Sequence, residues 1–280
     1  MIARLLSLIT VLFLAACAST PPMPEVVPGY EEVQDGDILI KAVPSKYLGG
    51  SVPRTEVDYA GPDKPGSIVV DTFARRLYYV LEGGRAIRYT IAVGREGLAF
   101  RGAGHIGRKE EWPSWTPTAN MLRTQSEMYR DYAGGLPGGL DNPLGARAMY
   151  LYRGGRDSYF RIHGTIDNSS IGRATSAGCI RLFNQDAIDL YGRVKIGARV
   201  KVRSEAESIE LEGQMMDDIN GHPIPYDAVL AEKIAAQKAE ADAAAAVAAA
   251  EAAAAEAEAA AEAEAAAVAA AEAAKDAAQG

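Results

Sequence analysis

The composition of the chain changes abruptly at Ala231. From there to Gly280 the sequence is alanine with spaced glutamates, and it lacks the leucine or isoleucine stripe that would bury a helix. Alanine is the strongest helix former, so we expect an exposed tail that is helical, about 70 Å long if fully so, or disordered. The alternative is a spacer or a partner-binding arm. Only Gly29 to Leu211 can build a core, and its roughly 180 residues suit one domain.

The tail also carries most of the charge. Its ten acidic residues and three lysines account for nearly all of the net charge of −8, which leaves the rest of the chain close to neutral. No basic patch is indicated, so nucleic acid is excluded as a partner.

Strand patterns dominate the part that can fold. Runs rich in β-branched and aromatic residues are punctuated by glycine and by Asp71-Thr72. These runs are "SIVVDT", "RLYYVLEG", "AIRYTIAVG", "AMYLYRGG", "SYFRIHG" and "ARVKVRS". One helix is expected at 184–194, with Asn184 as its cap and an apolar side from Ala187 to Tyr191. The pattern predicts a mainly β domain with a few short helices.

A long stretch from Gly94 to Asn142 has weak periodicity. Segments of this length are usually functional loops or disordered. It contains Trp112 and Trp115, the two tryptophans of the chain. These rings either wall a binding cleft or plug the edge of the core.

The N-terminus has the pattern of an exported protein. Arg4 precedes an apolar run that is too short to span a bilayer, which fits a secretory signal. Leu14-Ala15-Ala16-Cys17 resembles a bacterial lipoprotein cleavage site, so residues 1–17 would form the signal, with a lipid on Cys17. The alternative is a plain signal cut near Ala16 or Ala18. Residues 18–30 are rich in proline and are interpreted as a tether.

Three histidines and one remaining cysteine are candidates for chemistry. His105 and His222 fall in expected loops, and a loop histidine is more often just solvated. Alternation along 159–163 places His163 and Arg161 on one face, at the end of a strand followed by Gly164-Thr165. If Cys17 is lipidated, Cys179 has no disulfide partner. The alternative is that Cys179 is a buried thiol with a structural role only.

The short link between His163 and Cys179 is rich in small residues, so the thiol can fold back toward the imidazole. A histidine within hydrogen-bond range can take the proton of a thiol or hold a thiolate–imidazolium pair. Gly178 permits a tight turn, and its N–H could face a developing oxyanion. Arg181 would hold a substrate carboxylate or support the thiolate. One cysteine and one well-placed histidine do not complete a zinc site, so no metal is expected.

The segment "IHGTIDNSSIGRATSAGCIRLFNQDAIDLYGRVKIGARVKV" resembles the L,D-transpeptidase (YkuD) catalytic domain. Its His-Gly-Thr, spacer and Ser-x-Gly-Cys-x-Arg fall in the family's order, and the resemblance covers 66–203 within a domain assigned to 31–211. It implies a YkuD-like β-sandwich, with 212–280 as linker and tail. Ala177 stands where the family usually has a second histidine, whereas the general base maps to His163.

The resemblance also implies a function that needs no cofactor. The nucleophile would be Cys179, the base His163, and the substrate a peptidoglycan stem tetrapeptide whose terminal D-alanine leaves as a 3→3 crosslink forms. The alternatives are an L,D-carboxypeptidase, a hydrolase of peptidoglycan–lipoprotein links, or a non-catalytic peptidoglycan-binding lipoprotein whose tail binds an envelope protein. We expect a periplasmic protein held through Cys17, by analogy at the outer membrane. The residues expected to contact substrate are Gly164, Thr165, Ser176, Trp112, Trp115 and Asn142.

Overall fold

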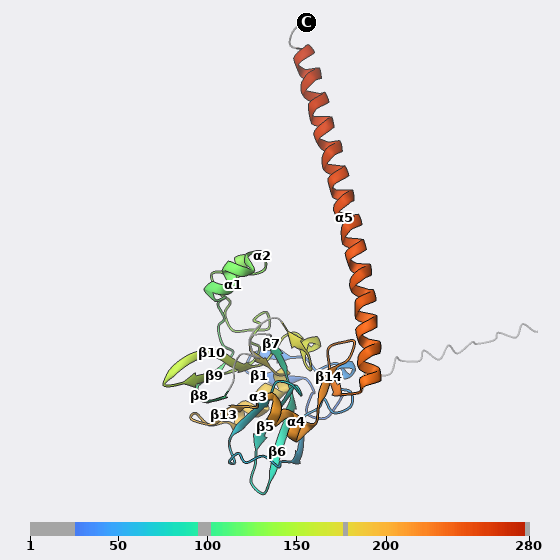
Figure 1. Ribbon diagram of the computed structural model, residues 1–280. Helices are drawn as coiled ribbons and strands as arrows, with labels where there is room; N and C mark the ends of the chain where they lie inside the picture. The colour runs from blue at the N-terminus through green and yellow to red at the C-terminus, as the bar shows by residue number, and fades with distance from the viewer. Residues whose placement is uncertain (1–25, 95–101, 176–178, 278–280) are drawn as a thin grey trace, which may run out of the picture.

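Residues 26–94, 102–175 and 179–277 are described by the computed structural model, and one large sheet organises them (Figure 1). Its strand order is β11-β7-β12-β10-β9-β8-β13-β4-β5-β6-β3, and two small hairpins, β1-β2 and β14-β15, flank it. The strands of the large sheet are β3 (Thr55–Asp58), β4 (Ile68–Asp71), β5 (Arg76–Val80), β6 (Arg85–Thr90), β7 (Ala92–Gly94), β8 (Gly102–Glu111), β9 (Arg147–Arg153), β10 (Arg156–His163), β11 (Ala174–Thr175), β12 (Ile180–Arg181) and β13 (Arg199–Val202). The other elements are β1 (Val33–Asp35), β2 (Ile38–Ile40), β14 (Met215–Asp217), β15 (Pro223–Pro225), α1 (Ala119–Thr124), α2 (Ser126–Tyr129), α3 (Asn184–Arg193), α4 (Glu205–Glu212), α5 (Ala228–Ala277) and 3-10 turns at Ser45–Tyr47, Arg130–Tyr132 and Asn168–Ser170.

The sheet curls over on itself through the segment β6–β7. β6 pairs with β5 and β3 near one end of the strand order, whereas β7 pairs with β12 and β11 at the other end, and only the buried Ile91 separates them. Side chains from both halves therefore face one another and form a single core, as in a sandwich of two packed sheets. The core includes Ile68, Leu77, Tyr89, Val93, Ile106, Met149, Leu151, Ile162, Ile180 and Val200. The prediction of a mainly β fold is confirmed.

Helix α3 closes one side of this core. Ala187 and Leu190 are fully buried in the core, as the sequence pattern predicts. The expected cap by Asn184 is wrong: the N-cap position is Phe183, which makes no side-chain hydrogen bond. The amide oxygen of Asn184 instead accepts a hydrogen bond from the backbone N–H of Ala146 at 2.9 Å. Because the start of α3 is buried beside β9, the Asn184 side chain bonds the backbone that leads into β9 and does not cap its own helix.

Strand β8 corrects the expectation of a long loop after Gly94. Its first residues, 102–105, pair with β13 and residues 105–111 pair with β9, so it joins these two strands within the sheet. Its residues include three glycines and the run Arg108-Lys109-Glu110-Glu111, which conceal the alternation of a strand. The hydrogen bonds of two neighbouring strands fix a segment whose own pattern is weak.

Residues 27–30, expected to belong to the tether, are part of the packed domain. Tyr30 is fully buried, and its ring meets Phe183 edge-on at 5.7 Å. Its hydroxyl donates to Asp186 at 3.1 Å, and the Arg54 guanidinium forms an ion pair with the same carboxylate at 2.8 Å. Burial raises the pKa of Asp186 to about 6, although Arg54 acts in the opposite direction. This network attaches the N-terminal segment to α3, which carries the chain away from β12.

Replacing Arg54 with alanine is expected to destabilise the protein by about 3 kcal/mol at pH 8, because the buried carboxylate loses its partner. Without Arg54 the pKa of Asp186 rises further, so the folded state binds a proton that the unfolded state does not. The destabilisation should therefore be smaller at pH 5 than at pH 8. Chemical denaturation at both pH values measures it. The control is Arg85→Ala, which removes an arginine that pairs with two exposed carboxylates; an equal loss in both variants would contradict the account.

The C-terminal part packs on the domain before the tail leaves it. The Ser204 side chain caps α4, and Asp71 accepts hydrogen bonds from Ser208 of α4 and from Arg203. The β14–β15 hairpin is joined to the domain by an ion pair from Arg75 to Asp217 at 2.8 Å.

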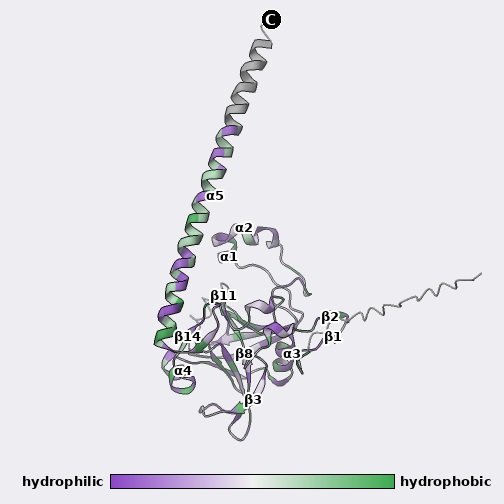
Figure 2. Ribbon diagram, turned by 90° about the vertical axis from the view of Figure 1, so that its right-hand side faces the viewer, coloured by the Kyte–Doolittle hydropathy of each residue, from purple (hydrophilic) through white to green (hydrophobic). Residues whose placement is uncertain are grey.

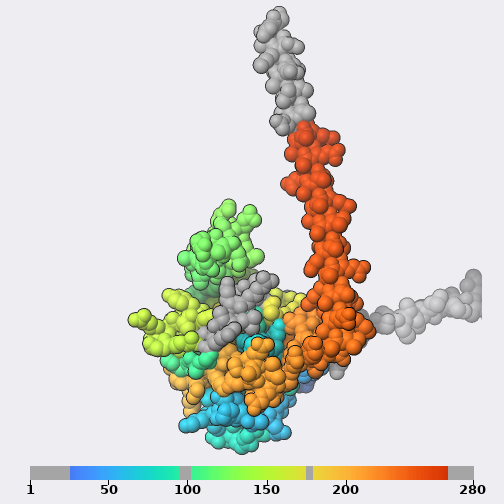
Figure 3. Space-filling model, in the orientation of Figure 1, coloured from blue at the N-terminus to red at the C-terminus, as the bar shows by residue number. Residues whose placement is uncertain are grey.

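The tail itself is the long helix α5, which confirms the helical alternative. Figures 1 and 3 show it projecting away from the domain, and Figure 2 shows hydrophilic and apolar residues interspersed along the coloured part of its ribbon. At 1.5 Å per residue its 50 residues extend about 75 Å. In the described part of the chain, no helix has both the length and the apolarity required to cross a membrane.

Candidate active site

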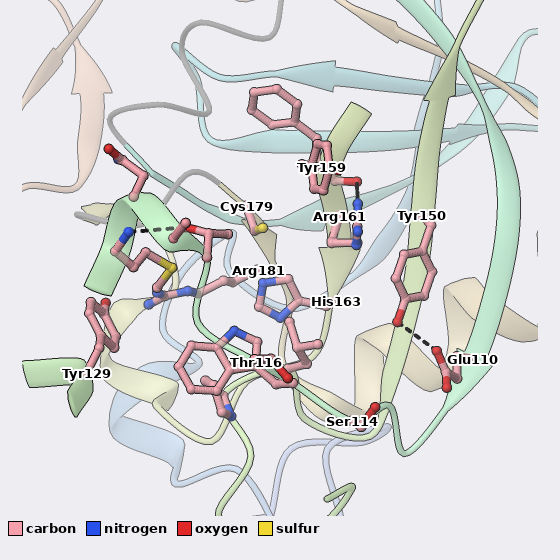
Figure 4. Close-up of a pocket in the computed structure, with 18 of the residues that line it drawn as sticks. Glu110, Ser114, Thr116, Tyr129, Tyr150, Tyr159, Arg161, His163, Cys179 and Arg181 are labelled. Atoms are coloured by element: carbon pink, nitrogen blue, oxygen red, sulfur yellow. Dashed lines mark hydrogen bonds between the residues drawn. The ribbon is translucent and has the colours of Figure 1, made fainter. Parts of the chain in front are cut away.

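A pocket of about 880 Å³ lies where β10 and β12 end (Figure 4). One wall is the sheet, and the other is the segment 114–129 with helices α1 and α2. His163, Cys179 and Arg181 all line it. The two chemically reactive side chains that the sequence singles out therefore open into one cavity.

Strand pairing explains why these side chains converge. β10 and β12 run parallel, with Ile162 level with Ile180 and His163 level with Arg181. Both isoleucines are buried in the core. Successive side chains of a strand point to opposite faces, so His163, Arg181 and Cys179 share the face that the pocket occupies.

His163 is held as a neutral imidazole. Its side chain is 3% exposed, and Nδ1 lies 2.5 Å from the carbonyl oxygen of Gly164. A carbonyl only accepts, so Nδ1 carries the hydrogen and Nε2 keeps its lone pair. Burial, and then the nearby positive charge of Arg181, lower the pKa of His163 to about 3. At neutral pH the ring is an uncharged proton acceptor.

The orientation of this imidazole depends on two glycines. A Cβ on Gly164 would lie 2.2 Å from the Asn184 amide oxygen, and one on Gly145 would lie 2.7 Å from the carbonyl carbon of Gly164. Gly145 also has a φ of +62°, which other residues rarely adopt. A side chain at Gly145 or Gly164 would therefore displace the Gly164 carbonyl, which fixes the tautomer of His163.

Cys179 is half-buried and reaches the pocket. Figure 4 shows its sulfur on the same side of the sheet as the His163 ring, with Arg181 beside them. A guanidinium beside a thiol favours the thiolate and simultaneously disfavours an imidazolium. The nearby charge of Arg181 thus helps to keep the His163 imidazole neutral.

Most of the expected substrate contacts lie elsewhere. Trp115 lines the pocket, and its ring packs against Tyr129 of α2 at 6.0 Å. Thr165 is buried, and its hydroxyl accepts a hydrogen bond from Asp167 N. The Asn142 amide is buried and donates to the carbonyls of Pro113 and Pro137. These two residues, together with Gly164 and Trp112, are absent from the described lining of the pocket. Ser176, Gly178 and Cys17 lie outside the described residues.

The pocket also contains residues that the sequence did not single out for substrate binding. Met121 and Tyr129 come from the two short helices, and Tyr159 comes from an irregularity in β10. Arg161, two positions before His163, lines the pocket on the face that alternation predicts. The helices lie in the stretch without periodicity, which offered no signal.

The other two histidines lie apart from the pocket lining. His105 is on β8 and packs against the Tyr152 ring, with centroids 6.1 Å apart. His222 follows the β14–β15 turn and lies against Gly172. In the ranges that the structure describes, no three His, Cys, Asp or Glu side chains cluster closely enough to hold a metal ion.

The protonation state of His163 gives a pH prediction. Since its pKa is lowered to about 3, the imidazole should stay unprotonated through mildly acidic pH. We expect the rate of a reaction in which His163 accepts a proton to change little between pH 7 and pH 4.5. A rate profile on the purified protein measures it. A tenfold fall centred near pH 6.5, the value of a free imidazole, would contradict the assigned environment.

A neutral, oriented imidazole beside a pocket-facing thiol is the arrangement of cysteine enzymes that transfer acyl groups. The L,D-transpeptidase catalytic domain (YkuD) model matches residues 65–202. A relative from Fuscovulum blasticum that is named as an L,D-transpeptidase is 42% identical over 138 residues, which cover 48% of this chain and 68% of the relative. The probable L,D-transpeptidase ErfK/SrfK of Escherichia coli is 36% identical, over 48% of this chain and 43% of its own length.

A solved structure from Brucella melitensis, described as a probable carnitine operon oxidoreductase, is 45% identical and covers 55% of this chain and 95% of its own, with a TM-score of 0.40. Membership of a family is therefore judged from the sequence matches. The chain belongs to the L,D-transpeptidase (YkuD) family.

Proposed function

We propose that this protein is a peptidoglycan L,D-transpeptidase that works through a thioester on Cys179. The donor is a stem tetrapeptide, and the bond cleaved joins its third residue to the terminal D-alanine. One observation carries the proposal: His163 and Arg181 lie on two adjacent parallel strands, Cys179 directly precedes the second strand, and all three line the same pocket. The names of the sequence relatives support the same reaction class.

In the first half-reaction, Nε2 of His163 takes the proton of the Cys179 thiol as the sulfur attacks the donor carbonyl. A tetrahedral oxyanion forms and then collapses. The bond to D-alanine breaks, and the imidazolium returns its proton to the departing amine. The low pKa of His163 makes it a strong donor at this step, since the charged ring is disfavoured by burial. The enzyme is left as a thioester with a neutral histidine.

In the second half-reaction, the side-chain amine of another stem attacks the thioester. His163 takes a proton from the attacking nitrogen and gives it to the sulfur as the C–S bond breaks. An amide crosslink forms, and the free thiol is restored. Because the thioester conserves the free energy of the cleaved amide, no external energy source is needed. Water in place of the amine would give a carboxypeptidase.

Arg181 is proposed to stabilise negative charge in this cycle. It lines the pocket at the level of His163 and lowers the pKa of that ring. We propose that the protein acts in the periplasm, held to the envelope by a lipid on Cys17. The N-terminal signal pattern supports this placement.

The products that the protein forms from purified stem tetrapeptides distinguish the proposed function from its alternatives. Mass spectrometry after incubation should show dimers that have lost one D-alanine, and none with Cys179→Ala. Tripeptide monomers without dimers would replace the transpeptidase by the carboxypeptidase alternative. Unchanged tetrapeptide, with peptidoglycan still bound, would favour the non-catalytic lipoprotein.

A further inference from the structure

A second polar feature of the pocket lies on β8, across the sheet from the thiol. Nη1 of Arg108 donates to Oε2 of Glu110 at 2.8 Å, and the Tyr150 hydroxyl donates to the same oxygen at 2.7 Å. The guanidinium of Arg108 lies over the Tyr150 ring, 3.5 Å from its centroid. Both charged side chains line the pocket, and Figure 4 shows Glu110 and Tyr150 on a wall distinct from Cys179.

This pair keeps unused hydrogen-bonding capacity. The Arg108 side chain is 49% exposed and that of Glu110 is 36% exposed. Within the described residues, Oε1 of Glu110 accepts no hydrogen bond, and Nε and Nη2 of Arg108 donate none. Glu110 can therefore accept a hydrogen bond from a ligand ammonium, and Arg108 can donate to a ligand carboxylate beside it. A ligand that carries an ammonium and a carboxylate on the same carbon atom would bind both side chains.

Arg161 is not equivalent to Arg108. Its guanidinium forms two hydrogen bonds to Asp157 and also donates to its neighbouring carbonyl, and its side chain is 15% exposed. It lies over the Tyr150 ring as well, at 4.3 Å. Arg161 therefore supports Tyr150, and Tyr150 in turn holds Glu110. Arg161 thus serves to position Tyr150, whereas Arg108 and Glu110 keep hydrogen-bonding atoms that a ligand can use.

The pair lies at a defined separation from the nucleophile. In the sheet order β12-β10-β9-β8, Arg161 is opposite Tyr150 and Tyr150 is opposite Arg108. Cys179 precedes β12, so three strand spacings, about 14 Å, separate its backbone from that of Arg108. The arginine side chain shortens this gap. A diamino diacid acylated on the thiol carries its far ammonium and carboxylate about 7 Å beyond the carbonyl carbon, which brings them within reach of the pair.

We propose that Arg108 and Glu110 bind the free amino-acid end of the third residue of the donor, and so select a diamino diacid over lysine. Arg108 would pair with the side-chain carboxylate and Glu110 with the ammonium on the same carbon. The inference rests on the proposed function, because it takes the donor acyl group on Cys179 as its reference point. A lysine at this position offers the ammonium alone and would forgo the arginine.

The test compares two tetrapeptide donors that differ at the third residue, meso-diaminopimelate and L-lysine. The wild-type protein should release D-alanine from the first with a kcat/KM at least tenfold higher. Arg108→Gln should reduce this ratio to about threefold or less by lowering only the diaminopimelate value. Glu110→Gln, which keeps an acceptor for Tyr150, should lower the value for both donors. Glu111→Gln is the control, since its side chain is on the same strand but does not line the pocket.

The outcomes separate the inference from the function. If the wild type releases D-alanine and Arg108→Gln leaves the ratio unchanged, the subsite is wrong and the transpeptidase proposal stands. If the wild type releases D-alanine from neither donor, both are overturned. Thermal unfolding of each variant shows whether a lost rate reflects lost structure, and a Tm within a few degrees of the wild type is expected because Arg108 and Glu110 are partly exposed.

Discussion

Replacing Cys179 with alanine is expected to lower the rate of D-alanine release by at least about 10⁴-fold. In the proposed reaction Cys179 is the group that bonds covalently to the donor, and its removal leaves only substrate binding and charge stabilisation. D-alanine release from a purified stem tetrapeptide, followed by mass spectrometry, measures the effect.

The same variant should fold normally. Cys179 is half-buried and lies outside the main hydrophobic core, so loss of its sulfur removes little packing. Its thermal unfolding should match the wild type within a few degrees. A variant that is folded and retains a tenth of the wild-type rate would show that another group attacks the donor.

Replacing His163 with glutamine is expected to lower the same rate by about 10³-fold, within the usual range for a lost general base. Glutamine can form hydrogen bonds in place of the imidazole, but it cannot take the thiol proton. The size of the loss should fall as pH rises toward the thiol pKa, because more of the sulfur is then already ionised. Rates between pH 6 and pH 9 measure this convergence.

His105 provides the matched control. It is a histidine on β8 of the same sheet and does not line the pocket. His105→Gln should leave the rate and its pH dependence unchanged. If His163→Gln behaves like His105→Gln, the buried imidazole is not the base.

The convergence of His163 and Cys179 could be predicted because it depends on local features. Alternation along β10 fixes the face of His163, and the small residues between it and Cys179 let the chain fold back toward the imidazole. The strands β4, β5 and β6 could be predicted from their runs of β-branched and aromatic residues, and α3 from the helical spacing of its buried Ala187 and Leu190.

The rest of the site depends on partners that are distant in sequence. β8 carries the Arg108–Glu110 pair, and it is a strand because β13 pairs with its first half and β9 with its second half. The burial of Tyr30 depends on Asp186, 156 positions later. Asn184 is a good helix cap by type, yet Ala146 N takes its oxygen. No local pattern contains these contacts, so the opposite wall of the pocket and the N-terminal attachment appear only with the tertiary structure.

The most direct test of the central claim is to trap the acyl-enzyme. The wild-type protein is mixed with a stem tetrapeptide, quenched in acid within the first turnover, and measured as the intact chain by mass spectrometry. The account predicts an added mass equal to the tripeptide acyl group, mapped by proteolysis to Cys179, and no such addition in Cys179→Ala. Release of D-alanine by a protein whose Cys179 never carries the acyl group would contradict it.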